Sequence, residues 1–181
     1  MDMISGGRFG MIALLDKKLL ILTPPKCGST SLHTYLCQHV DSVFIIGPQL
    51  DGRIDKHTGR IPFDFRNYKR YLVVRNPYTR FISLYKHHLL FNQYKSVDEF
   101  IKTYHKNPFN QNISDVYKIQ FNYWKLENLS QCLKDAGISY KVPLLNESEE
   151  RSEGLTLEQK IKISQWAKPD CESFNYDFFE K

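Results

Sequence analysis

The chain has 181 residues with no internal repeat or linker-like stretch, so we expect a single domain over residues 1–181. Its 41% apolar and 14% aromatic content excludes a disordered protein. The net charge is +5, but the basic residues form no run dense enough to indicate nucleic acid as a partner.

The N-terminal region predicts a β-hairpin. An apolar stretch, Met11–Leu15, ends at Asp16, far short of the roughly 20 residues that span a membrane. We therefore expect no signal peptide, no membrane anchor and a cytoplasmic location. The stretch instead pairs well with Leu19–Thr23, with the residues DKK as the turn between two strands.

The stretch from Leu19 to Val40 predicts a strand, a tight loop and a helix. Pro24 and Pro25 end the strand because neither can donate a backbone hydrogen bond. Helical spacing begins soon afterwards, with apolar residues at Leu32, Tyr35, Leu36 and Val40. The loop between them holds a lysine, a glycine and three hydroxyls, which suits an anion because helix N-termini present free N–H groups. The alternative is an ordinary β–α turn with capping serines.

A second strand–loop–helix unit follows. Val43–Ile46 predicts another strand, and residues 49–60 predict a polar surface loop. Tyr71–Val74 predicts a buried strand that ends at Arg75, and Asn76-Pro77 predicts a helix start because asparagine caps helices and proline suits their first position. The helix has an apolar face and an opposite stripe, which consists of Arg80, Ser83 and His87.

The C-terminal half continues the alternation of strands and helices. We expect a helix over 97–106 opened by a Ser96–Glu99 capping box, a strand over 121–126, and helices over 129–136 and 156–167. In the last helix, the expected core residues are Leu157, Ile161, Ile163 and Trp166. This order predicts an α/β domain with a mainly parallel central sheet flanked by helices. Parallel strands end at one edge, where ligands bind, so the two loops together predict a ligand with two separated anionic groups.

Several segments resemble the sulfotransferases that use 3′-phosphoadenosine 5′-phosphosulfate (PAPS). TPPKCGSTSL is similar to their 5′-phosphosulfate loop, and VVRNPYTRFISLYKH to their 3′-phosphate segment, R-x-P-x-x-R-x-x-S-x-Y. KLENLSQCLKDAGI, PLLNES and DCESFNYDF resemble later segments of the carbohydrate O-sulfotransferases, including the uronyl 2-O type. The resemblance covers about residues 19 to 178 and implies a fold similar to the P-loop NTPases.

The resemblance also implies roles for individual residues. The residues implied for the 5′-phosphosulfate are Lys26, Cys27, Gly28, Ser29, Thr30 and Ser31. Arg75 and Ser83 are implied for the 3′-phosphate, and Lys26 for neutralising charge on the leaving phosphate. Cys27 stands where relatives often carry threonine, valine or alanine, so we expect a passive thiol. The four cysteines lack C-x-x-C spacing, and we expect no metal.

The acceptor hydroxyl must lose a proton, which calls for a general base. In the uronyl 2-O type a histidine precedes the arginine strand, and His57 occupies a comparable place, with Lys56 beside it. The alternatives are that His57 belongs to an ordinary solvated loop, or that His33 or Glu99 is the base.

These residues predict transfer of a sulfuryl group from PAPS to a hydroxyl-bearing acceptor, a carbohydrate or a small molecule. Two other classes stay open: a P-loop nucleotide kinase or NTPase, and a non-catalytic nucleotide-binding module. The kinase hypothesis is disfavoured because the chain has no G-x-x-x-x-G-K-[ST] motif; Lys26 precedes the glycine of its loop.

Overall fold

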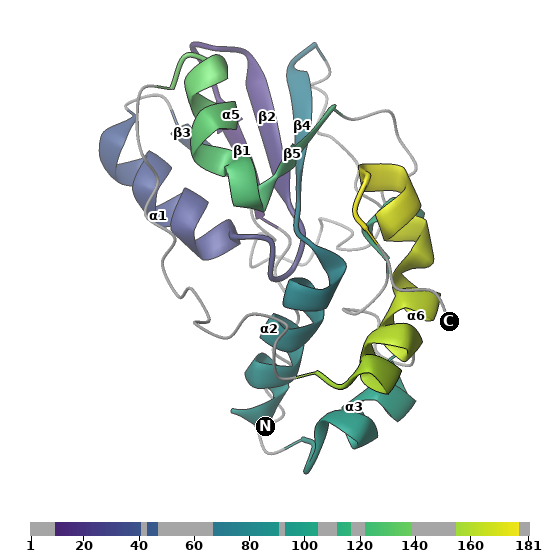
Figure 1. Ribbon diagram of the computed structural model, residues 1–181. Coiled ribbons are helices and arrows are strands. Elements are labelled where there is room, and N and C mark those ends of the chain that lie inside the picture. The colour runs from purple at the N-terminus through teal and green to yellow at the C-terminus, as the bar shows by residue number, and fades with distance from the viewer. Residues whose placement is uncertain are drawn as a thin grey trace.

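The structure is a computed structural model, and it describes residues 10–40, 43–46, 67–90, 93–104, 112–116, 122–138 and 155–177. The strands are β1 (Gly10–Leu14), β2 (Leu19–Thr23), β3 (Val43–Ile46), β4 (Lys69–Val74) and β5 (Asn122–Lys125). The helices are α1 (Ser29–His39), α2 (Pro77–Leu89), α3 (Val97–Thr103), α4 (Ile113–Val116), α5 (Leu129–Asp135) and α6 (Leu157–Phe174). The described strands and helices follow one another in the order β1-β2-α1-β3-β4-α2-α3-α4-β5-α5-α6, so the strict alternation that the sequence predicts holds only in part (Figure 1).

The described strands form one five-stranded sheet in the order β3-β1-β2-β4-β5. β2 pairs with β4 and β4 with β5 in parallel, whereas β1 is antiparallel to both β2 and β3. The expectation of a mainly parallel sheet is therefore correct for β2, β4 and β5 and wrong around β1. The reason is the β1–β2 hairpin itself, since the tight turn at 15–18 reverses the chain and sets β1 against its successor.

The sheet is covered by an apolar core to which β2 contributes Leu19, Leu20, Ile21 and Leu22, and its last residue, Thr23, is buried as well. Leu32 and Leu36 of α1 and Leu133 of α5 are fully buried in the same cluster. Burial of each such side chain stabilises the fold by about 1.5–3 kcal/mol. This packing holds the carboxyl end of β2 firmly and so positions the loop that follows it.

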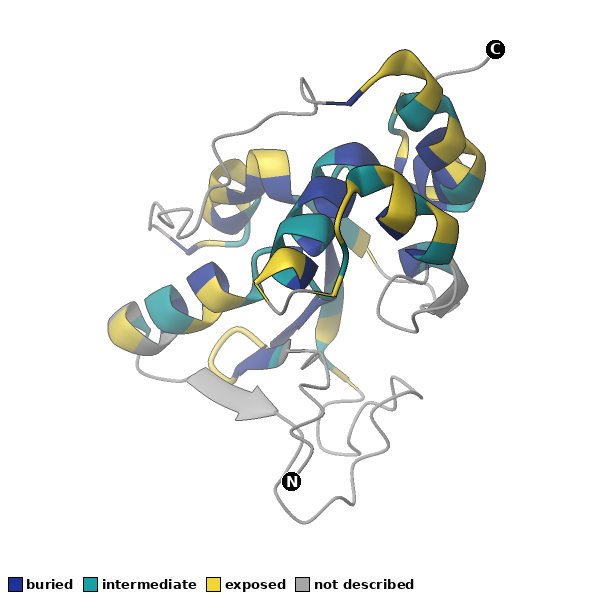
Figure 2. Cartoon of the chain, turned by 90° about the horizontal axis from the view of Figure 1, so that it is seen from below, coloured by how far each residue is buried: buried dark blue, intermediate teal, exposed yellow. Residues whose placement is uncertain are grey.

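A second apolar cluster joins α2, α3 and α6, which lie together beyond the end of the sheet where β4 runs into α2 (Figure 1). Phe81 and Phe100 are its most deeply buried rings, 5.1 Å apart between centroids. Figure 2 shows that these helices turn their buried faces toward one another and their exposed faces outward. The cluster therefore fixes the direction in which α2 leaves the sheet.

The last helix differs from the sequence prediction in length and in its core residues. The sequence predicts it over 156–167; in the structure Thr156 is its N-cap, and the helix continues through Pro169 to Phe174. A proline removes one backbone hydrogen bond, but packing of this helix against α2 and α4 compensates for the loss. Ile163 is buried as expected, whereas Leu157 is 64% exposed because it is the first residue of the helix, outside the cluster.

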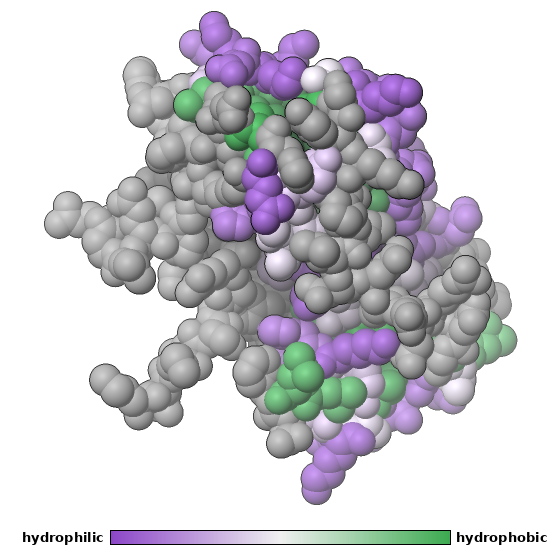
Figure 3. Space-filling model, turned by 90° about the vertical axis from the view of Figure 1, so that its left-hand side faces the viewer, coloured by the Kyte–Doolittle hydropathy of each residue, from purple (hydrophilic) through white to green (hydrophobic). Residues whose placement is uncertain are grey.

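The α3 helix is shorter than expected, ending at Thr103 rather than Lys106. Exposed apolar side chains among the described residues are Leu15, Leu89, Leu90 and Leu157. On the face drawn in Figure 3, hydrophobic surface forms small patches bordered by hydrophilic residues. Within the described residues, no helix combines the length and the apolar character needed to cross a membrane.

Candidate functional site

The loop between β2 and α1, residues 24–28, makes a tight reversal that aims the start of α1 at the edge of the sheet. The Cys27 N–H donates to the Pro24 carbonyl at 3.1 Å. Two residues adopt left-handed backbone conformations, Lys26 with φ of 65° and Gly28 with φ of 82°. The left-handed region costs a residue with a Cβ about 1–2 kcal/mol, so Lys26 is held there by its surroundings.

The N-terminus of α1 has no side-chain cap, unlike those of α2, α3 and α6. Asn76, Ser96 and Thr156 cap α2, α3 and α6 with side-chain oxygens. In α1 the capping residue is Gly28, no side chain caps the first turn, and that turn has no acidic residue. The first-turn N–H groups and the positive end of the helix dipole therefore face the loop with no side-chain cap among the described residues, an arrangement that suits an anion.

The side chains of the loop differ in accessibility. Thr30 is exposed and Ser29 half-buried, whereas Ser31 is buried. The Cys27 side chain is fully buried, and burial raises the pKa of its thiol to about 12. A protonated, enclosed thiol is a poor nucleophile, in agreement with the passive role expected for Cys27.

Gly28 lies directly against the segment that follows β5. A Cβ at this position would come within 2.6 Å of Cδ1 of Leu126, which belongs to a 3₁₀ turn over Leu126–Asn128. Glycine is thus required for two reasons, the left-handed backbone and the close approach. Sequence spacing alone could not reveal the second, because Leu126 is far away along the chain.

We expect Gly28→Ala to destabilise the protein more than Gly137→Ala does. Both glycines have positive φ, but a Cβ at Gly137 would meet only the flexible end of Lys17, at 3.4 Å. The shared backbone strain costs about 1–2 kcal/mol, and the Leu126 clash adds to it only at Gly28. Urea unfolding of both variants measures the difference, and a double variant with Leu126→Ala should lose less than the sum. Equal losses at the two glycines would contradict the clash.

Arg75 connects the second loop to the first. Its Nη1 donates to the Lys26 carbonyl at 3.2 Å and its Nε to Thr79 Oγ1 at 3.1 Å. The Asn76 side chain caps α2 by accepting from the Tyr78 and Thr79 N–H groups, as the sequence predicts. The two loops therefore meet at one edge of the sheet, with Lys26 and Arg75 side by side.

Lys26 carries a perturbed ammonium group. Its side chain is half-buried, and burial together with the positive charge of Arg75 lowers its pKa. Two neighbouring cations repel each other, so the pair favours an anion between or beside them. Electrostatics and the uncapped α1 terminus thus point to the same ligand charge.

Arg80 is buried, although the sequence places it on the stripe opposite the apolar face of the helix, with Ser83 and His87. It is 2% exposed, and its Nε donates to the Pro25 carbonyl at 3.3 Å. Its Nη1 lies 3.8 Å from Asp170 Oδ2. Arg80 therefore fastens the 24–28 loop to α6 rather than facing a ligand.

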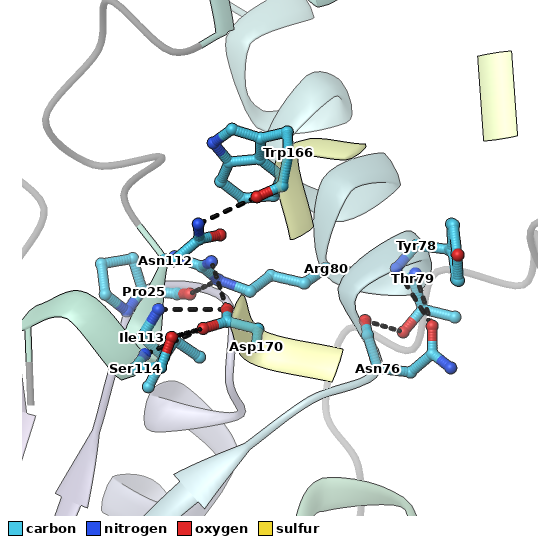
Figure 4. A network of polar contacts seen from close by, with 10 residues as sticks. All are labelled: Pro25, Asn76, Tyr78, Thr79, Arg80, Asn112, Ile113, Ser114, Trp166 and Asp170. Atoms are coloured by element: carbon cyan, nitrogen blue, oxygen red, sulfur yellow. Dashed lines mark hydrogen bonds and ion pairs between the residues drawn. The ribbon is translucent and has the colours of Figure 1, made fainter. Parts of the chain in front are cut away.

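Asp170 is the centre of this network, and reasoning from residue types alone does not single it out (Figure 4). Its carboxylate accepts hydrogen bonds from the N–H groups of Ile113 and Ser114 and from the Ser114 hydroxyl, at 2.8 to 3.0 Å. It is 2% exposed. Asp170 is the first residue of the segment DCESFNYDF, which resembles a segment of the carbohydrate O-sulfotransferases. That resemblance could have drawn attention to Asp170, but it assigned the residue no role.

Glu127 and Tyr176 support the second loop from outside. Glu127 Oε1 accepts from the Asn76 N–H at 2.8 Å, and Oε2 from the Tyr176 hydroxyl at 2.9 Å. Burial and the Glu127 charge raise the pKa of Tyr176, which keeps the hydroxyl protonated as a donor. The residues after β5 and after α6 thus hold the N-cap of α2 in place.

The structure places the candidate bases differently. His57 lies outside the described residues. His33 is exposed on α1, and the Glu99 carboxylate accepts from the Lys95 N–H at 2.8 Å at the start of α3.

Ser83 and His87 are half-buried on α2, and burial, the Lys26 charge and His88 lower the pKa of His87. The sequence pattern placed His87 on the same stripe of the helix as Arg80 and Ser83 but assigned it no role.

Comparison with known proteins adds one match. A family model described as "Sulfotransferase family" matches residues 11–179. No curated protein and no solved structure matches the chain.

Proposed function

The chain belongs to the sulfotransferase family, and from this premise we propose that it transfers a sulfuryl group from PAPS to a hydroxyl of a carbohydrate. The observation that carries the proposal is the meeting of two cationic loops at the uncapped N-terminus of α1. We further propose that the chain forms one domain with a P-loop-like fold, since a strand, an anion loop and a helix precede the parallel strand β4.

We propose that the first loop holds the 5′-phosphosulfate. The uncapped α1 terminus supplies backbone N–H donors, and Ser29 and Thr30 add accessible hydroxyls. The residues proposed for this role are Lys26, Cys27, Gly28, Ser29, Thr30 and Ser31. Cys27 contributes only loop backbone because its thiol is enclosed, and the absence of a Cβ at Gly28 keeps Leu126 clear of the loop.

We propose that Arg75 and Ser83 hold the 3′-phosphate. Arg75 is fixed by its bonds to the Lys26 carbonyl and Thr79, so little side-chain entropy is lost when it binds. A guanidinium presents a planar fork that matches phosphate oxygens. Ser83 lies two turns into α2, on the same stripe as Arg80, which contacts the first loop.

Lys26 has the principal part in the chemistry. As the bond between sulfur and the bridging oxygen breaks, negative charge grows on the 5′-phosphate, and the Lys26 ammonium neutralises it. Because this site is partly enclosed, the ammonium acts with less screening than it would in water. The rest of the catalytic effect comes from holding the sulfuryl group and the acceptor hydroxyl in the right geometry, as in phosphoryl transfer.

The acceptor assignment rests on resemblance. The segments KLENLSQCLKDAGI and DCESFNYDF are similar to those of carbohydrate O-sulfotransferases of the uronyl 2-O type, and these segments contain Glu127, Asp170 and Tyr176. Glu127 and Tyr176 support the N-cap of α2, and Asp170 is linked to the first loop through Arg80. His57 is the base that the resemblance suggests.

We expect 3′-phosphoadenosine 5′-phosphate (PAP) to bind about 10- to 100-fold more tightly than AMP, which lacks only the 3′-phosphate. The reason is the charge-assisted contact of Arg75, which AMP cannot make. Isothermal titration calorimetry of PAP, AMP and ATP measures the order. Equal affinities for PAP and AMP would contradict the Arg75 and Ser83 assignment, and preference for ATP would favour a kinase or NTPase. PAP binding without transfer of labelled sulfate to any glycan would favour a non-catalytic module.

A further inference from the structure

The protein itself holds the Arg75 guanidinium at two of its nitrogen atoms. Nε donates to Thr79 Oγ1 at 3.1 Å, and Nη1 donates to the Lys26 carbonyl at 3.2 Å. A guanidinium is a rigid plane, so bonds at two different nitrogens fix both its position and its tilt. The orientation of this proposed phosphate ligand therefore depends on Thr79 as well as on the first loop.

The hydrogen bonds of Thr79 determine the direction of its hydroxyl proton. Oγ1 lies 3.1 Å from Arg75 Nε and 3.1 Å from the Asn76 carbonyl oxygen, a contact drawn in Figure 4. A hydroxyl has one proton, a guanidinium can only donate and a carbonyl can only accept. The Thr79 proton must therefore go to the Asn76 carbonyl, which leaves a lone pair of Oγ1 facing Arg75. These bonds restrict a χ1 angle that β-branching already limits.

The bond from Arg75 to Thr79 orients the guanidinium without neutralising it. The oxygens that accept from Nε and Nη1 belong to a hydroxyl and a carbonyl, and neither carries a charge. Arg80, the residue after Thr79, shows the other arrangement, because it is buried with its Nη1 3.8 Å from the Asp170 carboxylate. A guanidinium held by neutral acceptors at these two nitrogens suits a role as an anion ligand.

We propose that Thr79 is a positioning residue that sets the selectivity of the site for a 3′-phosphate. Its hydroxyl, directed by the Asn76 carbonyl, holds the Arg75 guanidinium in the orientation that meets the phosphate. This inference rests on the proposed function, in which Arg75 binds the 3′-phosphate. Without the hydroxyl, the Arg75 side chain has more freedom to rotate, and the ligand must then order it at a cost in entropy.

The competing role for Thr79 is a merely structural one, in the first turn of α2. Several other bonds hold that turn, however. The Asn76 carbonyl also accepts from the Arg80 N–H at 2.8 Å, and the Asn76 side chain accepts from the Tyr78 and Thr79 N–H groups. Valine has the shape of threonine but no hydroxyl. Thr79→Val therefore removes the contact with Arg75 while the backbone bonds of the turn are kept.

The test compares PAP with AMP by isothermal titration calorimetry. We expect Thr79→Val to weaken PAP binding by about 10-fold, because a hydrogen bond to a charged group is lost, and AMP binding by less than about twofold. Thr79→Ser keeps the hydroxyl and should restore most of the PAP affinity. In an Arg75→Ala background, Thr79→Val should change PAP affinity by less than about twofold, because the group that Thr79 orients is gone.

Thr103→Val is the matched control. Thr103 is also a half-buried helical threonine, and its hydroxyl donates to the Glu99 carbonyl at 3.1 Å. It lies on α3, outside both nucleotide loops, so this variant loses a similar bond and should keep wild-type affinity for PAP and AMP. A loss of PAP affinity in Thr103→Val as large as that in Thr79→Val would contradict a specific role of Thr79.

A second measurement needs no ligand. Exchange of the Arg75 Nε proton with solvent, followed by ¹⁵N-edited NMR, should be slower in the wild type and in Thr79→Ser than in Thr79→Val. Equal exchange rates would overturn the inference, and so would equal losses of PAP and AMP affinity in Thr79→Val or a loss that persists without Arg75. If the wild type preferred PAP and Thr79→Val kept that preference in full, only the role of Thr79 would be wrong. A wild type that bound PAP no better than AMP would overturn the proposed 3′-phosphate site itself, and the role of Thr79 with it.

Discussion

Replacing Lys26 should lower turnover by about 100- to 1,000-fold, the effect of removing one preorganised group that stabilises transition-state charge. The sharpest variant is Lys26→Gly, because Lys26 has a φ of 65° and glycine adopts that conformation without strain. The variant should therefore be as stable as the wild type, or more stable by up to about 1 kcal/mol, although it is nearly inactive. Single-turnover release of labelled sulfate gives the chemical rate, and thermal unfolding gives the stability.

Arg75→Ala provides the contrast with Lys26→Gly. Arg75 has its proposed contact with the 3′-phosphate in substrate and product alike, so its removal should weaken PAP binding more than it slows the chemical step. The Lys26 variant should show the reverse pattern. If both variants lost affinity and rate in the same proportion, the separate roles of the two cations would have to be abandoned. A Lys26→Gly protein much less stable than wild type would contradict the account of backbone strain.

Asp170→Ala should lower the free energy of unfolding by about 3–5 kcal/mol, the usual cost of breaking a buried ion pair from one side. The substitution leaves the Arg80 guanidinium buried without its carboxylate and removes the acceptor for the Ile113 and Ser114 N–H groups. Arg80 also holds the Pro25 carbonyl, so the 24–28 loop should loosen and PAP binding should weaken in the same variant.

The same helix supplies the matched control. Glu172 forms an exposed pair with Lys168 at 3.6 Å, and Glu172→Ala should cost at most about 0.5 kcal/mol. Urea unfolding compares the two variants directly. Adding Arg80→Met to Asp170→Ala should restore part of the lost stability because it removes the buried charge that the Asp170 carboxylate offsets in the wild type. A loss in Asp170→Ala as small as that in Glu172→Ala would show that the network contributes little to the fold.

The features that the sequence determined by itself are those whose causes lie within a few residues. The β1–β2 hairpin follows from two apolar stretches around a polar turn. The start of α2 follows from Asn76 and Pro77, and the start of α3 from the capping box at Ser96 and Glu99. The order of strand, glycine-containing loop and helix at 19–39 was likewise predictable, because each signal is local; that no side chain caps this helix is known only from the structure.

Other features required the tertiary structure, because their causes are distant in the chain. The burial of Arg80 depends on Asp170 of α6, the need for Gly28 depends partly on Leu126, and α6 passes through Pro169 because it packs against α2 and α4. Helical periodicity identified one stripe for Arg80, Ser83 and His87, but it could not tell which of them would be covered. That depends on which element packs over each side chain: Asp170 of α6 pairs with the buried Arg80, whereas Ser83 and His87 stay half-buried.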